Sequence, residues 1–136
     1  MIYTSKSAEE TEKIAEALAK QYPPPHTFCL SGELGAGKTA FTRGLAKGYG
    51  FDGRVSSPTF TIMNIYEGAI PVYHYDLYRI NDEDELFDIG FEPSSEGGIT
   101  VVEWYDMFKH LFESENVSFV CVSRGEDDCD RIIEIN

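Results

Sequence analysis

Residues 32 to 39 read Gly32-Glu33-Leu34-Gly35-Ala36-Gly37-Lys38-Thr39, which fits the phosphate-loop pattern G-x-x-x-x-G-K-S/T at all four specified positions. Each residue type has a physical reason in such a loop. The glycines let consecutive backbone N–H groups turn toward a phosphate, the lysine reaches the outer phosphates, and the threonine hydroxyl is left to ligate Mg²⁺. The stretch therefore predicts a site for the phosphates of a nucleotide.

The residues on either side of this loop have the patterns of a strand and a helix. Thr27-Phe28-Cys29-Leu30-Ser31 is a β-prone run that ends where the loop begins, and residues 39–49 have the pattern of a helix closed by Gly50. A helix that starts beside a glycine loop points its free amides and the positive end of its dipole at a bound anion. This context favours a P-loop over an accidental glycine loop.

Length and composition predict a single domain, residues 1–136. The chain has 136 residues, of which 42% are hydrophobic, so it is long enough for one core and short for two. No apolar run reaches membrane-spanning length and the first residues lack the apolar region of a signal peptide, so we expect a cytoplasmic protein without membrane contact. The three cysteines, Cys29, Cys121 and Cys129, lack metal-site spacing and are expected to be reduced thiols.

The charge balance constrains the partners. The chain carries 24 acidic and 11 basic residues, a formal net charge of −13. Nucleic-acid binding draws most of its affinity from lysine and arginine contacts to phosphate. We therefore expect no binding to DNA, and contact with RNA only indirectly, through a protein partner.

The rest of the chain predicts further helices and strands around the loop. Helices are expected at residues 7–22, starting at the capping box Ser7-Ala8-Glu9-Glu10, and at residues 82–88 and 104–112. A strand is expected at residues 99–102, and β-hairpins at residues 60–66 with 72–75 and, at the sheet edge, 117–122 with 131–135. The hairpins make the sheet mixed. The predicted class is α/β, a P-loop NTPase-like three-layer fold whose mixed central sheet includes antiparallel hairpins.

Two carboxylates follow predicted strands. Asp76 comes after residues 72–75 and Glu103 after residues 99–102. Ligands of open α/β sheets lie beyond the carboxyl ends of the strands, so these acids are candidates to hold Mg²⁺ with Thr39. One can orient the metal while the other ligates it or positions the attacking water. Spacing alone does not divide these roles, and solvated strand-end acids are the alternative.

Several other residues have two interpretations. Ser57 and Thr59 lie in a hydroxyl-rich loop that could sense a terminal phosphate or be an ordinary turn. Trp104 could cover the site, contact a partner or pack in the core. We interpret His74 as a hydrogen-bonded structural histidine rather than a base or ligand, and Glu33 as directed away from the phosphate.

The chain contains four motifs in a fixed order. After the phosphate loop come Ser57-Pro58-Thr59-Phe60, His74-Tyr75-Asp76-Leu77-Tyr78-Arg79 and Glu103-Trp104. The phosphate loop alone is common to many proteins, whereas the set is specific. In order and spacing the four motifs resemble the bacterial TsaE (YjeE) family, the ATPases of tRNA threonylcarbamoyladenosine (t6A) biosynthesis.

The resemblance implies an ATPase that depends on Mg²⁺, is weak alone and works with the partners TsaD and TsaB. It implies that Lys38, Asp76 and Glu103 are catalytic, with Thr39, Glu103 and Asp76 at the metal. The implied ATP-binding residues are Thr11, Gly35, Ala36, Gly37, Lys38, Thr39 and Ala40.

Two other functions remain open on the sequence. A small P-loop kinase would transfer the terminal phosphate to a metabolite, but it usually needs a lid that supplies arginines, and no arginine-rich insertion is present. A nucleotide-gated binding module with negligible hydrolysis is the non-enzymatic alternative. A GTPase is disfavoured, because the chain contains neither a D-x-x-G nor an N/T-K-x-D segment.

Overall fold

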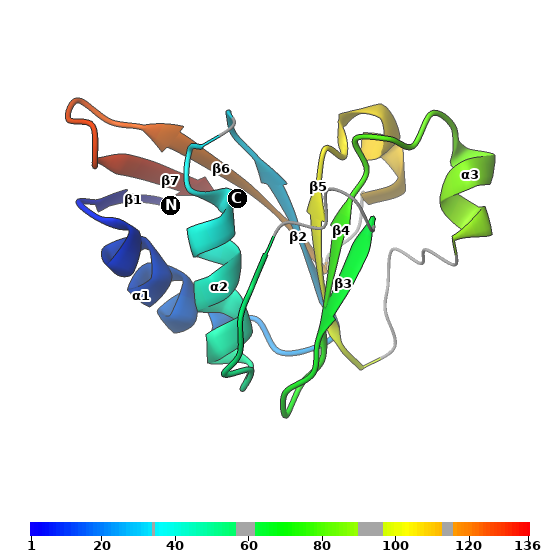
Figure 1. Cartoon of the computed structure of the whole chain (residues 1–136), viewed down its shortest axis with the longest axis horizontal. Helices are drawn as coiled ribbons and strands as arrows, with labels where there is room; N and C mark the ends of the chain where they lie inside the picture. Colours follow the sequence, from blue (N-terminus) through cyan, green and yellow to red (C-terminus); the bar gives the residue numbers. More distant parts are fainter. Residues whose placement is uncertain (34, 57–61, 90–96, 113–115) are drawn as a thin grey trace.

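A mixed seven-stranded sheet forms the centre of the molecule in a computed structural model that describes residues 1–33, 35–56, 62–89, 97–112 and 116–136 (Figure 1). The strand order is β1-β7-β6-β2-β5-β4-β3. Strands β4, β5, β2 and β6 run parallel to one another. Strand β3 pairs antiparallel with β4, β7 pairs antiparallel with β6, and β1 pairs antiparallel with β7. The strands are β1 (Ile2–Ser5), β2 (His26–Ser31), β3 (Met63–Tyr66), β4 (Val72–Asp76), β5 (Ile99–Glu103), β6 (Val117–Arg124) and β7 (Arg131–Ile135).

Helical segments cover both faces of this sheet. Helices α1 (Ala8–Ala19) and α2 (Lys38–Gly48) pack on one face, and α3 (Glu83–Asp88) and the 3₁₀ segment η1 (Asp106–Phe112) on the other (Figure 1). Side chains of β2 contribute to the hydrophobic cores on both faces of the sheet, because successive strand residues point to opposite faces. Phe28 and Leu30 pack with α1 and α2, while Cys29 packs with Phe108 of η1. The predicted three-layer α/β fold with a mixed sheet is confirmed.

The first helix begins where its capping box predicts. The amide of Glu10 donates to the Ser7 hydroxyl at 3.1 Å, which satisfies one of the free amides of the first turn. The helix ends at Ala19, before the predicted end at Tyr22. Helix α2 ends at Gly48, one residue before the predicted end at Tyr49, and Gly50 follows in a left-handed conformation at φ 100°, consistent with the predicted closure by Gly50.

Helices α1 and α2 approach closely at Gly44. A Cβ on this residue would lie 2.2 Å from the carbonyl oxygen of Glu12 and 2.8 Å from the Cβ of Ala15. Neither atom belongs to the end of a flexible side chain. The approach of the helices therefore requires glycine here.

Gly44→Ala is expected to lower the free energy of unfolding by about 1–3 kcal/mol, measured by urea denaturation, because the added methyl overpacks the helix contact. The sign is informative, since alanine is ordinarily the better residue inside a helix by about 0.5–1 kcal/mol. Lys47→Ala, at an exposed position of the same helix, is the control and should change little. A stabilised Gly44→Ala protein would contradict the close approach.

Three predictions about strands and helices need correction. The β6–β7 hairpin forms, but its position at the sheet edge is wrong, because β1 pairs outside β7. The β3–β4 hairpin forms, but Ile62, predicted to belong to its first strand, instead precedes β3 with a left-handed φ of 69°. Residues 60 and 61 lie outside the described residues. The helix predicted from Trp104 is wrong at its start and in its type. Trp104 has φ 59°, which ends β5, and η1 is a 3₁₀ segment interrupted at Phe108.

The buried cysteine has a packing role. Cys29 has no exposed surface, and burial raises the pKa of its thiol to about 12, so it stays protonated and unreactive. Cys121 and Cys129 are exposed, and all three thiols are free. The expectation of reduced, unpaired cysteines agrees with this arrangement.

His26 makes stability depend on pH. It is buried at the start of β2 with Nε2 2.8 Å from the Ser118 hydroxyl, and burial lowers its pKa from the ordinary 6.5. The unfolded chain therefore binds this proton more readily, so stability is fully present above about pH 6.5 and is lost as pH falls from there toward the folded-state pKa.

Urea unfolding of the wild type and of His26→Gln across this range tests that dependence. The glutamine amide can still bond Ser118 but does not titrate, so His26→Gln should lose less stability than the wild type on acidification. Equal losses in the two proteins would show that His26 is not responsible.

Candidate active site

The loop between β2 and α2 adopts a backbone that only glycine supports well. Gly32, Gly35 and Gly37 have φ values of 148°, 79° and 108°. At Gly32 a Cβ would also lie 2.3 Å from the carbonyl oxygen of Val122. Left-handed residues of this kind let successive amides face one concavity, which is the geometry of an anion-binding loop.

The start of α2 differs from the starts of the other two α-helices. Ser7 and Asp82 cap α1 and α3 with side-chain oxygens, and both helices carry acidic residues in their first turns. Helix α2 is preceded by Gly37, has no side-chain cap and has no acid in its first turn. Its first amides, including those of Thr39 and Ala40, therefore have no intrahelical acceptor and suit an exogenous anion.

Lys38 is a buried cation next to a buried acid. Its residue exposure is 9%, and Nζ lies 3.6 Å from Oε1 of Glu103. Nζ also lies 5.0 Å from the ring centroid of Trp104, within cation–π range. The lysine of the loop and an acid at the end of β5, which are far apart in sequence, therefore form one site.

The two candidate carboxylates lie side by side. Asp76 and Glu103 are register partners on the parallel strands β4 and β5, and both are buried. Val72 and Val101, which share their faces by the two-residue period, pack in the core cluster that contains α2. Both acids therefore point to the face of the sheet where α2 begins.

Glu103 is fixed by His74. The imidazole Nε2 lies 2.6 Å from Oε2 of Glu103, and since a carboxylate only accepts, the ring donates this bond. Burial acts to raise the pKa of Glu103, but the hydrogen bond and attraction from His74 and the charge of Lys38 outweigh it and lower that pKa. Glu103 is thus held ionised, and His74 is hydrogen bonded within the sheet as interpreted from the sequence.

The oxygen atoms of Thr39, Asp76 and Glu103 are of the type that suits Mg²⁺, which prefers carboxylate, hydroxyl and phosphate oxygens and retains several waters. The hydroxyl of Thr39 makes no hydrogen bond to any described residue. Asp76 accepts the amide of Tyr78 on Oδ1 at 3.0 Å. Thr39, Glu103 and Asp76 could therefore ligate a magnesium ion bound with a nucleotide, or orient the waters around it.

The remaining residues singled out from the sequence differ in burial and in their hydrogen bonds. Ala36 is buried and its amide donates to the carbonyl of Glu33 at 3.0 Å, while Glu33 itself is exposed, as predicted. Thr11 is 1% exposed, and its hydroxyl bonds the Ser5 hydroxyl at 2.7 Å. A contact of Thr11 with nucleotide thus remains a prediction. Ser57 and Thr59 lie outside the described residues.

Trp104 is a surface residue of the site. It is 43% exposed and its ring lies 5.0 Å from that of Tyr78, which is 68% exposed. Interpretation of Trp104 as a core residue is therefore wrong. A bulky residue held at φ 59° is rare and costs conformational energy, which is typical of functional positions.

Two arginines to which no sequence motif points lie beside the loop. Arg131 of β7 donates from Nη2 to the carbonyl of Gly35 at 3.4 Å. Nη2 of Arg124, on β6, lies 3.3 Å from where a Cβ on Gly35 would be. Arg124 and Arg131 are register partners at the ends of β6 and β7, so the predicted hairpin could have placed them close together. Their closeness to the phosphate loop depends on the parallel pairing of β6 with β2, which the sequence does not specify.

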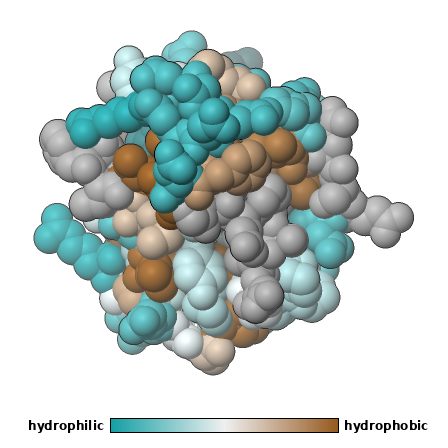
Figure 2. Space-filling model, turned by 90° about the vertical axis from the view of Figure 1, so that its right-hand side faces the viewer, coloured by the Kyte–Doolittle hydropathy of each residue, from teal (hydrophilic) through white to brown (hydrophobic). Residues whose placement is uncertain are grey.

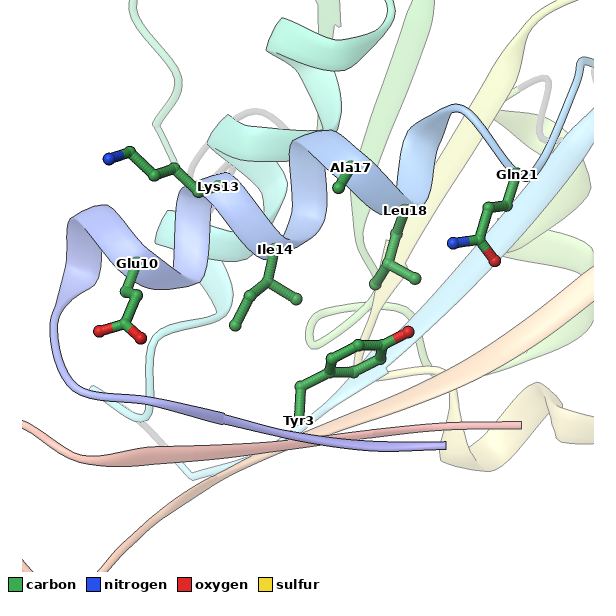
Figure 3. Close-up of a pocket in the computed structure, with 7 residues that line it drawn as sticks. All are labelled: Tyr3, Glu10, Lys13, Ile14, Ala17, Leu18 and Gln21. Atoms are coloured by element: carbon green, nitrogen blue, oxygen red, sulfur yellow. The ribbon is translucent and has the colours of Figure 1, made fainter.

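A separate pocket lies between β1 and α1, with Tyr3 turned toward Ile14 and Leu18 and with polar Glu10, Lys13 and Gln21 around them (Figure 3). None of the residues predicted to bind ATP or metal lines it. In the described part of the chain, no helix combines the length and apolar character needed to cross a bilayer.

The protein belongs to the P-loop class. It combines a glycine loop, an uncapped helix start, a buried lysine and acids at strand ends on a mixed three-layer fold. Similarity to known proteins identifies the family within this class. A family model described as threonylcarbamoyl adenosine biosynthesis protein TsaE matches residues 5–133. The chain therefore belongs to the TsaE family.

Individual relatives agree with this assignment. The tRNA threonylcarbamoyladenosine biosynthesis protein TsaE of Bacillus subtilis is 41% identical over 122 residues, which cover 88% of this chain and 76% of that protein. The protein of the same name from Rickettsia conorii is 39% identical over 112 residues, covering 81% of this chain but 64% of its own length. The crystal structure of Bacillus subtilis YdiB is similar with a TM-score of 0.76 at 34% identity, covering 98% of this chain and 82% of that chain.

Proposed function

We propose that this protein is a Mg²⁺-dependent ATPase that acts with TsaD and TsaB in the t6A modification of tRNA. The observation that carries the ATPase proposal is the contact of Lys38 with Glu103 beside the uncapped start of α2. It joins a phosphate-binding cation, free amides and a metal-binding acid at one place. The biosynthetic role comes from family membership.

In this proposal the phosphates occupy the loop. Amides from Gly35 to Ala40 bind the phosphate oxygens, and Lys38 leaves Glu103 to neutralise the outer phosphates. Bound Mg²⁺ would neutralise charge on the outer phosphates during transfer to water. Glu103 and Asp76 would hold this ion, directly or through water, with the Thr39 hydroxyl, and one of the two acids would position the attacking water. The whole chain, 1–136, is proposed to work as one ATPase domain.

The partner surface is proposed to lie beside this site. Trp104 and Tyr78 are exposed there, and Phe87 and Ile89 are exposed on and next to the acidic helix α3. Figure 2 shows the side of the molecule on which α3 lies, where apolar surface is interspersed with hydrophilic groups. With a net charge of −13, this acidic and aromatic surface suits a basic protein partner that itself holds tRNA. We propose a cytoplasmic protein that contacts tRNA only through such partners and binds neither DNA nor membrane.

Phosphate release measured with and without the TsaD–TsaB pair tests the proposal. We expect slow, Mg²⁺-dependent release alone and faster release with the pair. Release only in the presence of a metabolite acceptor would support a small kinase instead. Nucleotide binding without turnover in either mixture would support a nucleotide-gated module. Tight binding of tRNA by the protein alone would contradict the indirect role.

A further inference from the structure

A series of hydrogen bonds runs from the Glu103 carboxylate across three strands. His74 of β4 contacts Oε2 of Glu103 through Nε2, as described above, and its Nδ1 lies 2.9 Å from the hydroxyl of Tyr66 in β3. That hydroxyl lies 2.8 Å from the carbonyl oxygen of Ser56, and because a carbonyl cannot donate, Tyr66 donates this bond. Strands β3, β4 and β5 are consecutive in the sheet (Figure 1).

The three side chains that form these hydrogen bonds are buried. His74 has no exposed surface, and Tyr66 and Glu103 are 3% and 4% exposed. Burial, and to a lesser degree the charge of Glu103, raises the pKa of Tyr66, so its hydroxyl remains a donor. The ring of Tyr66 packs against Phe51 with centroids 5.1 Å apart. Close packing therefore limits the rotation of these three side chains.

The two oxygens of Glu103 face different groups. Oε2 is bound from behind by His74, whereas Oε1 lies 3.6 Å from Nζ of Lys38 at the phosphate loop. A carboxylate that accepted no bond on Oε2 could rotate about its last torsion, since this torsion is soft. The bond to His74 therefore decides which oxygen is presented to the loop.

We propose that His74 and Tyr66 are positioning residues that hold the Glu103 carboxylate in its working orientation toward Lys38 and the phosphate loop. This inference rests on the proposed ATPase function, since it concerns the orientation that hydrolysis uses. Supporting groups of this kind at metal sites change affinity or activity by about 10- to 100-fold when they are removed. A buried network serving stability alone would change the free energy of unfolding when a bond is lost, but not kcat of the folded protein.

Substitutions at position 74 separate the two ring nitrogens. His74→Gln can place an N–H near the position of Nε2 and keep the bond to Glu103, whereas His74→Asn reaches only the position of Nδ1. We expect kcat to fall about 10- to 100-fold in His74→Asn with KM for ATP little changed. His74→Gln should restore most of this loss.

Tyr66→Phe removes only the hydroxyl and is expected to lower kcat by about 10-fold through a less constrained His74. Ser56 keeps a donor in this variant, because Nδ2 of Asn64 also bonds its carbonyl, at 3.0 Å. Tyr49→Phe is the matched control. Tyr49 is 4% exposed and donates its hydroxyl to the carbonyl of Tyr22 at 2.7 Å, so it loses the same kind of bond in the same core.

Tryptophan fluorescence of the nucleotide-free protein gives a readout independent of hydrolysis. Trp104 is the only tryptophan of the chain, and the Lys38 ammonium lies 5.0 Å from its ring. If Glu103 turns, Lys38 moves relative to the indole, so the emission maximum should shift in Tyr66→Phe and His74→Asn. It should stay at the wild-type value in Tyr49→Phe.

The two readouts distinguish the inference from the proposed function. A lowered kcat together with a shifted emission, both absent from Tyr49→Phe, would support positioning. Tyr66→Phe and His74→Asn proteins that match Tyr49→Phe in kcat and emission would overturn it. A wild-type protein that hydrolyses no ATP, alone or with TsaD and TsaB, would contradict the proposed ATPase function. The comparison of emission maxima would then test the positioning of Glu103 by itself.

Discussion

Lys38→Ala is expected to reduce ATP turnover by about 10³-fold or more, since it removes a cation preorganised for the charge that develops on the transferred phosphoryl group. The ammonium sits in a buried site, where a charge interacts far more strongly than in water. Nucleotide affinity should fall as well. Steady-state phosphate release and titration with a fluorescent ATP analogue measure the two effects.

Lys47→Ala is the control for this variant, because it removes the same charge from an exposed position of the same helix. It should hydrolyse ATP like the wild type. Lys38→Ala also leaves Glu103 without its lysine partner, so its urea unfolding must be measured. A folded Lys38→Ala protein with turnover within about threefold of wild type would contradict the role of the loop.

Glu103→Gln is expected to lower kcat by about 10²–10³-fold while ATP binding in the absence of Mg²⁺ is retained. Glutamine has the shape of glutamate and can still accept the His74 bond through its carbonyl oxygen, so the substitution removes the charge and the acceptor that faces Lys38 but keeps this bond. Phosphate release at increasing Mg²⁺, with ATP binding measured in EDTA, separates the two quantities.

The matched control is Glu134→Gln, the same chemical change at an exposed position of β7. It should leave both quantities unchanged. Normal hydrolysis by Glu103→Gln would show that Asp76 or another group has the metal-binding or water-positioning role assigned to Glu103. The same assay on Asp76→Asn would then divide the roles of the two acids.

The local parts of the site could be predicted from the sequence because their information is local. The loop ending in Lys38 is specified by glycine positions, and the acids Asp76 and Glu103 follow runs of strand-forming residues. Their closeness follows from a general rule for the carboxyl ends of parallel strands. The structure agrees, with Asp76 and Glu103 in register and Glu103 at Lys38.

The tertiary parts could not be predicted, because they depend on strand order and register. Tyr66 reaches His74 only because β3 pairs antiparallel with β4 in one register. The short strand β1 has too few residues for a clear periodic signal, and its pairing with β7 is fixed by contacts across the whole chain. The sequence could not decide whether Trp104 lies in the core or at the surface. Its surface position depends on a left-handed backbone, which tryptophan rarely adopts and which its residue type therefore does not predict.

A crystal structure with Mn²⁺ and a non-hydrolysable ATP analogue tests the central claim most directly, since anomalous scattering locates the metal. The account predicts the outer phosphates against the amides of Gly35 to Ala40 and within hydrogen-bond reach of Lys38. It predicts the metal beside the Thr39 hydroxyl, with Glu103 and Asp76 bound to it directly or through one water. Nucleotide bound elsewhere, or a metal remote from both carboxylates, would contradict it.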